Sequence, residues 1–373
     1  MKTILHISKY YHPYLGGIET VAKQVIDGLS TYNNIVVCFS SDKDTHIDYV
    51  DGVKIIRLGV ITNISSQDIS LNYYSALRNL IHKEHPWAIH LHCPNPFIYP
   101  FVLTLITKQT KLVLHWHSDI IDKGLLYTLV QPFEKRILSR ANVIIATSSN
   151  YLNGSQVLLP WREKVTIIPN VISAEQFIQQ KSDQHTINDI RTKWQNKHLL
   201  FFCGRHVAYK GIDKLIASAS YMDDDIQILI AGDGPLTAQY QEMAKNSNNI
   251  TFLGRISDDE LRCYLYATDA FAFPSITKAE AFGVALAEAM FCGCVPIVFT
   301  INGSGVNWVN INHETGSEVP INDVYAYAKA VCQIMHDDKL RHQMSINAHK
   351  RICDLFVTER LYQQINKLYN LFV

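Results

Sequence analysis

Two carboxylates, Glu280 and Glu288, stand eight residues apart on either side of a small, apolar stretch. The apolar run 270–273 precedes them, so the pattern predicts a strand, a short loop and a helix that begins near Phe282 or Gly283. The first turn of such a helix offers free backbone N–H groups and a positive dipole end to an anion. A diphosphate over the helix start, with a hydroxylated sugar for each carboxylate, would use all of these groups. The alternative is an amphipathic helix whose Glu288 faces solvent.

Cations and glycines follow other strand patterns in the second half of the chain. Arg205 and Lys210 lie five residues apart in a loop that begins at Gly204 and ends at Gly211. Arginine can grip two phosphate oxygens and lysine acts as a point charge, so this loop suits a diphosphate. The alternative is a pair of solvated loop cations. Two further loops at predicted strand ends contain Gly232, Gly234, Arg255 and Ile256. Three such loops at one sheet edge favour a shared anion site.

A glycine pair, Gly16 and Gly17, separates the first strand pattern from a helical one. Glycines at this position let the backbone approach a bulky or charged ligand closely. The Gly-x-Gly-x-x-Gly motif of dinucleotide-binding proteins is missing, so no such cofactor is indicated. The pair is equally compatible with a plain tight turn.

His117 lies at the end of the strand pattern 111–115. Side chains alternate along a strand, so His115 shares its face and one of the two histidines can simply be packed. His90 and His92 repeat this spacing on the preceding strand. We expect His117 to reach a ligand, because the carboxyl ends of parallel strands carry the binding site in doubly wound domains.

Two acidic pairs resemble the Asp-x-Asp metal motif of one class of sugar transferases: Asp42 with Asp44, and Asp223 with Asp225. Both stand in polar turns and are interpreted as solvated, because a metal-binding pair needs an anchoring second shell. Cys292 and Cys294 are the only closely spaced pair among the eight cysteines, and no second pair completes a zinc site. We therefore expect no metal and no cofactor.

Short β-branched runs alternate with helical patterns along the whole chain, which is typical of parallel α/β folds. The runs are 3–8, 35–40, 53–58, 88–92, 111–115, 143–147 and 165–168, then 199–203, 226–231, 250–253, 270–273 and 295–299. The polar interval that follows Pro169-Asn170 and runs through Gln184 is predicted to contain the linker. The pattern predicts two doubly wound, Rossmann-like domains that face a cleft.

The chain has 373 residues, enough for two domains with separate cores, and Lys plus Arg and Asp plus Glu both total 34. This balance gives no basic field for nucleic acid. The start of the chain is unlike a signal peptide, and no apolar run approaches the ~20 residues of a membrane span. The expected location is therefore cytoplasmic. Residues 1–172 nevertheless carry 16 Lys and Arg against 12 Asp and Glu.

One segment of this more basic half, 124–140, combines five apolar side chains with three cations, in a pattern that suits an anionic bilayer. These residues are Leu125, Leu126, Leu129, Val130, Phe133, Lys135, Arg136 and Arg140. The alternative is a helix whose apolar side faces its own sheet, favoured by Pro132 if it interrupts the pattern. A peripheral contact with the inner face of the cytoplasmic membrane is thus a hypothesis.

Taken in order, these motifs resemble those of the retaining glycosyltransferases of family 4, which have the GT-B architecture. The resemblance covers nearly the whole chain and includes the pair Pro169-Asn170 and the ending 356–369. It implies an acceptor-side domain, 1–172, a nucleotide-sugar-binding domain, 173–355, and a final helix, 356–373, that returns to the first domain.

The resemblance also implies a role for each residue at the site. Arg205 and Lys210 would hold the donor diphosphate, and Glu288 would bind the ribose hydroxyls. Glu280 would contact the transferred sugar, and His117 would touch it near the reacting carbon. The remaining donor-binding residues implied are Gly16, Gly17, Gly232, Arg255, Ile256, Ala281, Phe282, Gly283 and Val284.

The implied reaction is metal-independent transfer of a hexose, with mannose favoured, from a GDP- or UDP-linked donor. The acceptor would be a saccharide or a lipid-linked saccharide of O-antigen or capsule synthesis. Two alternatives remain: a sugar-nucleotide epimerase on the same architecture, and a catalytically silent binding subunit. The segment Ile301–Gly305 departs from the family pattern, in which two adjacent glycines are common.

Overall fold

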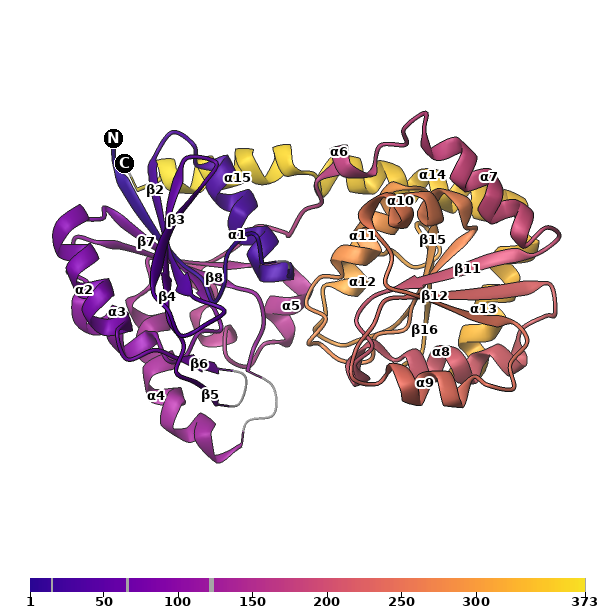
Figure 1. The fold of residues 1–373 in the computed structure, drawn as a ribbon, viewed down its shortest axis with the longest axis horizontal. Helices are drawn as coiled ribbons and strands as arrows, with labels where there is room; N and C mark the ends of the chain where they lie inside the picture. Colours follow the sequence, from indigo (N-terminus) through magenta and orange to yellow (C-terminus); the bar gives the residue numbers. More distant parts are fainter. Residues whose placement is uncertain (15, 65–66, 121–123, 373) are drawn as a thin grey trace. The chain divides into compact units, whose positions relative to one another are not determined.

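The computed structural model describes residues 1–14, 16–64, 67–120 and 124–372, which divide into two compact units (Figure 1). Unit 1 consists of Met1–Asn170 and Glu359–Val373, and unit 2 consists of Val171–Thr358. Each unit is an open, twisted sheet with helices on both faces. Fully buried parallel strands read as continuous apolar runs, which is why the sequence pattern located most of them.

Unit 1 contains an eight-stranded sheet in the order β10-β9-β8-β7-β1-β2-β4-β3. All neighbouring pairs are parallel except β3 and β4. The strands are β1 (Thr3–Ile7), β2 (Asn33–Phe39), β3 (His46–Val50), β4 (Val53–Leu58), β7 (Ala88–Cys93), β8 (Lys111–Trp116), β9 (Val143–Ala146) and β10 (Val165–Ile167). The strand order reverses between β1 and β7, which is the point where doubly wound sheets bind ligands.

The sheet of unit 1 is covered by helices and one short hairpin. These elements are α1 (Gly17–Gly28), α2 (Tyr73–Glu84), α3 (Tyr99–Leu105), α4 (Leu125–Arg140), α5 (Ser149–Gly154), η1 (Leu159–Lys164), α15 (Thr358–Asn370), and the hairpin β5 (Thr62–Ile64) with β6 (Gln67–Ile69). No helix in the described part of the chain is long and apolar enough to cross a bilayer.

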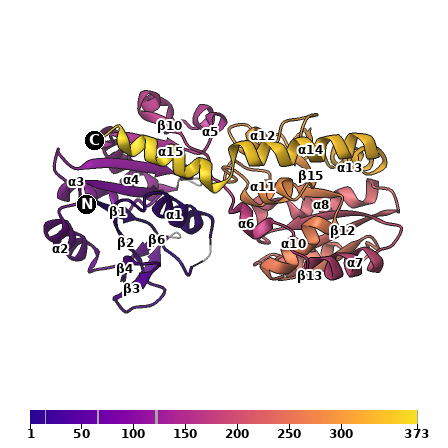
Figure 2. The same cartoon turned by 90° about the horizontal axis from the view of Figure 1, so that it is seen from above.

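The C-terminal helix α15 packs on α1, and Figures 1 and 2 both show the two helices side by side. The Asn366 side-chain amide donates to the Gly28 carbonyl over 2.6 Å. A Cβ at Gly28 would lie 2.7 Å from the Tyr362 ring, so glycine permits the close approach. Tyr369 is fully buried. These contacts make α15 part of the unit 1 core.

Unit 2 contains a six-stranded parallel sheet in the order β13-β12-β11-β14-β15-β16. The strands are β11 (His198–Cys203), β12 (Ile226–Ala231), β13 (Ile250–Gly254), β14 (Ala270–Phe273), β15 (Val295–Phe299) and β16 (Ser317–Val319). Alternate strand residues enter opposite cores: Phe201 packs on one face of the sheet and Phe202 on the other. The order reverses between β11 and β14.

Helices cover both faces of the unit 2 sheet. They are α6 (Ala174–Phe177), α7 (Asp183–Lys193), η2 (Ala208–Lys210), α8 (Ile212–Ser218), η3 (Ala219–Tyr221), α9 (Thr237–Met243), α10 (Asp258–Ala267), α11 (Val284–Phe291), α12 (Val306–Val309), α13 (Val324–His336) and α14 (Asp338–Leu355). The core that contains Phe201 includes α7, α10 and α11, and the core that contains Phe202 includes α8, α9 and α13.

The predicted fold class is confirmed, and the predicted strands agree with the structure to within two residues at each end. Four short strands are additional: β3, β5, β6 and β16. The division between the two units falls between Asn170 and Val171, at the start of the interval predicted to contain the linker, and within that interval Asp183 begins α7. The helix predicted near Phe282 or Gly283 begins at Val284.

Candidate active site

The carboxyl edge of the unit 2 sheet gathers most of the residues predicted to bind a donor. Arg205 and Lys210 follow β11, and Gly232 follows β12. Arg255 and Ile256 follow β13, while the segment 280–284 joins β14 to α11. Because β12, β11 and β14 are neighbours in a parallel sheet, their carboxyl ends meet at one edge.

Lys210 and Glu280 form an ion pair between Nζ and Oε2, with side chains that are 14% and 12% exposed. The Ser275 hydroxyl lies 3.4 Å from the same carboxylate oxygen. Burial, the largest single effect, lowers the pKa of Lys210, but the charge and hydrogen bond of Glu280 together with the charges of Tyr209 and Cys203 outweigh it, so the net pKa is raised and the ammonium stays charged. An ammonium has three N–H donors, so Lys210 can keep Glu280 and still bind an anion.

Arg205 is exposed, and its guanidinium has no hydrogen-bond or ion-pair partner within the described ranges. Arg255 is also exposed, and its Nε lies 3.7 Å from an oxygen of Asp233. Ile256 is half-buried and packs against the core below. Arg205 is therefore the cation of this edge with the freest donors for a phosphate.

Gly232 brings the loops after β11 and β12 into backbone contact. Its φ is +117°, and a Cβ there would overlap the carbonyl oxygen of Gly204. A side chain at this position would push the two loops apart. Gly232 thus has a packing role that the sequence alone does not separate from ligand binding.

The start of α11 is open and held by a neighbouring loop. Gly283 precedes the helix with φ +86°, and no side chain caps the first turn. The Ser304 hydroxyl donates to the Glu280 carbonyl, and the Gly305 N–H donates to the Ala281 carbonyl over 3.0 Å. The segment that departs from the family pattern therefore buttresses the backbone of the predicted site.

Two further residues of this segment differ in what they can offer. Phe282 is buried and makes an edge contact with the Phe356 ring, so only its backbone can face a ligand. Val284 is half-buried at the first position of α11.

Glu288 lies on the second turn of α11 and is half-buried. Its carboxylate has no hydrogen-bond or ion-pair partner in the part of the chain that the structure describes. Burial, and secondarily the charge of Asp258, raises the pKa of Glu288 to about 7, although Lys210 opposes the shift. A partly buried carboxylate without a donor is costly, and hydroxyl groups of a ligand would supply the missing donors.

In unit 1, Gly16 and Gly17 stand at the start of α1 after the carboxyl end of β1. Gly16 is the N-cap in extended conformation, and no side chain caps the helix. A Cβ at Gly17 would meet no atom within 4 Å among the described residues. The space beside Gly17 is therefore open, whereas a Cβ at Gly16 would collide with the Glu19 carboxylate.

His117 follows β8 and is 6% exposed. Its Nε2 lies 2.9 Å from Nδ1 of His92. Burial lowers the pKa of His117 to about 3, so the ring is neutral. The turn after it is fixed by Asp119, which accepts from Trp116 Nε1 over 3.0 Å and from Ser155 Oγ over 2.8 Å.

The histidines near His117 form a larger group than the sequence indicated. His90, His92 and His115 are buried, as one of the alternatives held, but they also contact one another and His117. His6 was not anticipated, although its position on β1 is in register with His90 on β7. Only the pairing register of β1 and β7, which a sequence pattern does not give, places His6 beside His90.

The acidic pairs lie in different settings. Asp42 is exposed and accepts hydrogen bonds from Ser40 Oγ and the Asp44 N–H. The side chains of Asp223 and Asp225 are 60% and 45% exposed, as expected for solvated turn residues, and both approach His336, at 3.5 and 3.1 Å. These residues lie at the amino end of β12, away from Arg205.

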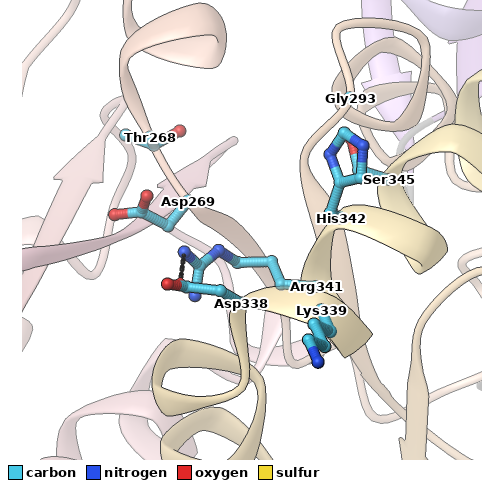
Figure 3. A pocket seen from close by; sticks show the side chains of 8 residues that line it. All are labelled: Thr268, Asp269, Gly293, Asp338, Lys339, Arg341, His342 and Ser345. Carbon is cyan, nitrogen blue, oxygen red and sulfur yellow. Dashed lines mark hydrogen bonds and ion pairs between the residues drawn. The ribbon is translucent and has the colours of Figure 1, made fainter.

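A cavity of about 550 Å³ also lies at the amino edge of the unit 2 sheet (Figure 3). Its lining includes Asp269 before β14, Gly293 before β15 and Arg341 on α14. In Figure 3 the guanidinium of Arg341 points to Asp338. This cavity contains none of the residues predicted for donor binding.

Family models match both parts of the chain. The model described as "Glycosyltransferase Family 4" matches residues 15–176, and "Glycosyl transferases group 1" matches residues 183–351. These matches fall largely within unit 1 and within unit 2, respectively.

Characterised relatives match over nearly the full length. An O-antigen chain mannosyltransferase of Escherichia coli is 28% identical over 98% of this chain and 97% of its own. A D-rhamnosyltransferase of Pseudomonas aeruginosa is 30% identical over 95% of this chain and 92% of its own.

Solved structures share the fold. Sucrose-phosphate synthase from Thermosynechococcus elongatus matches with a TM-score of 0.80 at 20% identity, over 100% of this chain and 99% of its own. The Anabaena protein HepE in complex with UDP and glucose matches with a TM-score of 0.77 at 17% identity, over 99% of this chain and 100% of its own. With these matches to sequence and fold, the chain belongs to the glycosyltransferases that combine a family 4 domain with a group 1 domain on the GT-B fold.

Proposed function

We propose that this glycosyltransferase moves a hexose of manno configuration from a nucleoside diphosphate sugar to a saccharide acceptor in the synthesis of a surface polysaccharide. The relatives that support this are named as an O-antigen mannosyltransferase, a D-rhamnosyltransferase and a capsular polysaccharide glycosyltransferase. Mannose and rhamnose share their configuration at carbon 2. The nucleotide base is either guanine or uracil, and the Anabaena structures with UDP and UDP-glucose are precedents for a nucleotide-sugar ligand.

The observation that carries the proposal is the arrangement around α11. Arg205 would bind two oxygens of the donor diphosphate, Lys210 would add a point charge, and the backbone N–H groups at the helix start would complete the anion site. Glu288 would accept hydrogen bonds from the ribose hydroxyls. Gly232, Arg255 and Ile256 would border the nucleotide.

The transferred sugar would lie against Glu280, with the backbone of Ala281, Phe282, Gly283 and Val284 beside it. Gly16 and Gly17 of unit 1 would leave room for the donor phosphate, and His117 would donate to a sugar oxygen. The bond from the anomeric carbon to the diphosphate oxygen breaks, and the acceptor oxygen bonds to the same carbon. The departing phosphate oxygen takes the acceptor's proton on that face, so the configuration is retained.

Double displacement by a protein carboxylate is not part of this proposal, because no residue assigned to the site is clearly placed as a nucleophile. The Oε2 of Glu280 lies against Lys210 and Ser275. We therefore assign Glu280 to sugar positioning and charge stabilisation.

The proposal requires no metal ion for the leaving group. The charge that develops on the diphosphate is offset by Arg205, Lys210 and the dipole of α11. We also propose that the acceptor is lipid-linked, so that unit 1 works at the inner face of the cytoplasmic membrane. Leu129 on α4 is 69% exposed, and Lys135 and Arg136 on the same helix are exposed.

A donor screen in excess EDTA tests this function. The purified protein is incubated with GDP-mannose, GDP-rhamnose, UDP-glucose or UDP-N-acetylglucosamine, together with a mannose-terminated oligosaccharide. We expect release of nucleoside diphosphate and an acceptor that gains one hexose through a retained linkage. A changed sugar nucleotide without any acceptor product would indicate an epimerase. Binding without turnover would indicate a silent subunit, and turnover restored only by magnesium or manganese would contradict metal independence.

A further inference from the structure

Five buried imidazole rings form a row through the sheet of unit 1, from His6 on β1 to His117 after β8. Adjacent ring centroids lie 5.4 Å apart for His6 and His90, 4.9 Å for His90 and His92, and 5.2 Å for His92 and His117. His115 stacks on His117 at 4.4 Å, with the ring planes 14° apart. His117 is the member of this row at the carboxyl end of the sheet.

Hydrogen bonds join the rings in two pairs, His92 with His117 and His115 with His90, and also join His6 and His90 to other side chains. His6 Nε2 bonds to the amide oxygen of Asn34, and His92 Nδ1 bonds to His117 Nε2. His115 Nδ1 bonds to His90 Nε2, and His90 Nδ1 bonds to the hydroxyl of Tyr369. Three other nitrogens are buried without a hydrogen-bond partner among the described residues: His6 Nδ1, His92 Nε2 and His115 Nε2.

These unpartnered nitrogens decide where the protons lie. Each neutral imidazole has one N–H and one lone pair, and a buried N–H without an acceptor is rare in proteins. The proton of His6 can be placed without using the other rings. The side-chain amide nitrogen of Asn34 donates to the Leu29 carbonyl, so its oxygen is the atom that faces His6 and accepts a hydrogen bond from Nε2. The proton of His6 is therefore on Nε2, and its unpartnered Nδ1 is a lone pair.

The same rule gives one consistent assignment for the rest of the row. His115 donates from Nδ1 to His90, His90 donates from Nδ1 to Tyr369, and His92 donates from Nδ1 to His117. All three unpartnered nitrogens are then lone pairs. The opposite direction at the last bond would leave an N–H at His92 Nε2 buried without an acceptor.

We infer that His92 is a positioning residue that fixes His117 as the tautomer protonated on Nδ1, so that His117 presents an N–H donor to a ligand. The Nδ1 of His117 has no hydrogen-bond partner within the described ranges. Its role toward a sugar oxygen rests on the proposed function, but the tautomer does not. Burial lowers the pKa of every ring in the row, so the donor is an N–H of neutral imidazole.

A metal site is the competing explanation, because ring nitrogens of His90, His92 and His115 lie within 4.8 Å of one another. Both nitrogens of His90 already take part in hydrogen bonds. The ring centroids of His92 and His115 lie 5.2 Å apart, with the ring planes 21° apart. The hydrogen-bonded row accounts for these contacts without an ion.

Long-range proton–nitrogen NMR spectra of histidine-labelled protein test the tautomer, with His117→Gln used to assign the resonances. We expect His117 to carry its proton on Nδ1 from about pH 6 to pH 9, where a solvated histidine would titrate. In His92→Asn the side-chain amide replaces the Nδ1 donor, so this tautomer should persist. In His92→Asp a carboxylate at the same place accepts a hydrogen bond instead of donating one, so the protonated nitrogen of His117 should change to Nε2. A proton on Nε2 in the wild type, an unchanged tautomer in His92→Asp, or zinc-induced shifts of His90 and His115 would each overturn the inference.

Transfer kinetics give a second measurement. His92→Asp should lower kcat about tenfold with little change in donor KM, because the proton of His117 moves to the nitrogen that faces away from the sugar. His92→Asn should restore most of it. The matched control is His6→Gln, which keeps a donor toward Asn34, and should have the wild-type kcat. If no donor is turned over, the proposed function fails while the NMR result stands. Equal kcat in His92→Asp and wild type would contradict the positioning role.

Discussion

Glu280 and Glu288 flank the same helix start in opposite electrostatic settings. Glu280 is paired with Lys210, whereas Glu288 is half-buried without a donor in the described chain. The first carboxylate is therefore held in an ion pair, and the second, with a pKa of about 7, changes its charge near neutral pH. If Glu288 holds the ribose, its ionisation should be visible in nucleotide binding.

The affinity for GDP or UDP should rise as the pH is raised from about 6 to about 8, because ionised Glu288 is the better acceptor for ribose hydroxyls. Without ligand, Glu288 has the opposite effect on stability. Its pKa in the folded protein, about 7, exceeds the ordinary value of 4.5, so the free energy of unfolding falls as the pH rises from 4.5 to about 7. Calorimetric titration of the wild type and of Glu288→Gln separates this effect from titration of the phosphate. Identical pH profiles for the two proteins would remove Glu288 from the site.

At the scale of elements, the sequence predicted the strands that form apolar or β-branched runs and missed β3 and β16, which do not. β3 alternates exposed and half-buried residues, including Ile47 and Tyr49, at the end of the sheet. β16 has only three residues. Neither provides the continuous apolar run on which the prediction depended.

The candidate site could be predicted as residue types at strand ends, but not as contacts. Lys210 meets Glu280 only because β11 is paired with β14, which are separated by two strands in the chain. His92 meets His117 only because of the register of β7 and β8. A pattern within one segment of the sequence does not predict such long-range pairings.

Helices α7 and α10 are joined by a buried, bidentate ion pair. Arg262 donates from Nε and Nη2 to the two oxygens of Asp183 over 2.7 and 2.9 Å. Asp183→Asn should destabilise the protein by about 3 kcal/mol, because it leaves a buried guanidinium partly unpaired. The control is Asp259→Asn. Asp259 contacts the same Arg262, but its side chain is 83% exposed, so this substitution should lower the free energy of unfolding by less than about 1 kcal/mol.

Urea denaturation measures both variants. The hydrogen bonds from Arg262 lower the pKa of Asp183, so its contribution is present above the ordinary value of 3.8 and is lost as the pH falls through the folded value. The difference between the wild type and Asp183→Asn should therefore shrink in acid. Equal losses of stability in Asp183→Asn and Asp259→Asn would contradict the conclusion that the buried pair of Arg262 and Asp183 stabilises the contact between α7 and α10.

At the scale of the whole molecule, charge is divided unevenly between the first and second halves of a neutral sequence. The proposed membrane face is on α4, in the positive half. Pro132 lies inside this helix without ending it, contrary to the expected interruption. Arg140 donates to the carbonyls of Thr107 and Thr110, so it is less available to lipid. The side chains of Leu125 and Leu126 lie outside the described residues.

Sedimentation with anionic vesicles tests this face. The protein should bind at low salt and dissociate at high salt, because lipid headgroups attract Lys135 and Arg136. Lys135→Glu with Arg136→Glu should weaken binding by more than about tenfold, since each cation near the surface contributes ~1 kcal/mol. Lys329→Glu with Lys350→Glu makes the same charge change on unit 2 and should bind like the wild type. No binding at low salt, or equal loss in both double variants, would exclude α4 as the contact.

The account depends most on the donor site at the carboxyl edge of unit 2, and one kinetic comparison tests it directly. kcat/KM for sugar transfer is measured for the wild type, Arg205→Ala and Glu280→Gln. The control is Lys214→Ala, because Lys214 is a partly exposed lysine on α8 that pairs with Asp213. We predict a loss of at least ~100-fold in Arg205→Ala and in Glu280→Gln, the scale of a lost transition-state contact, and an unchanged control. A folded Arg205→Ala or Glu280→Gln protein that keeps more than about a tenth of wild-type activity would contradict the account.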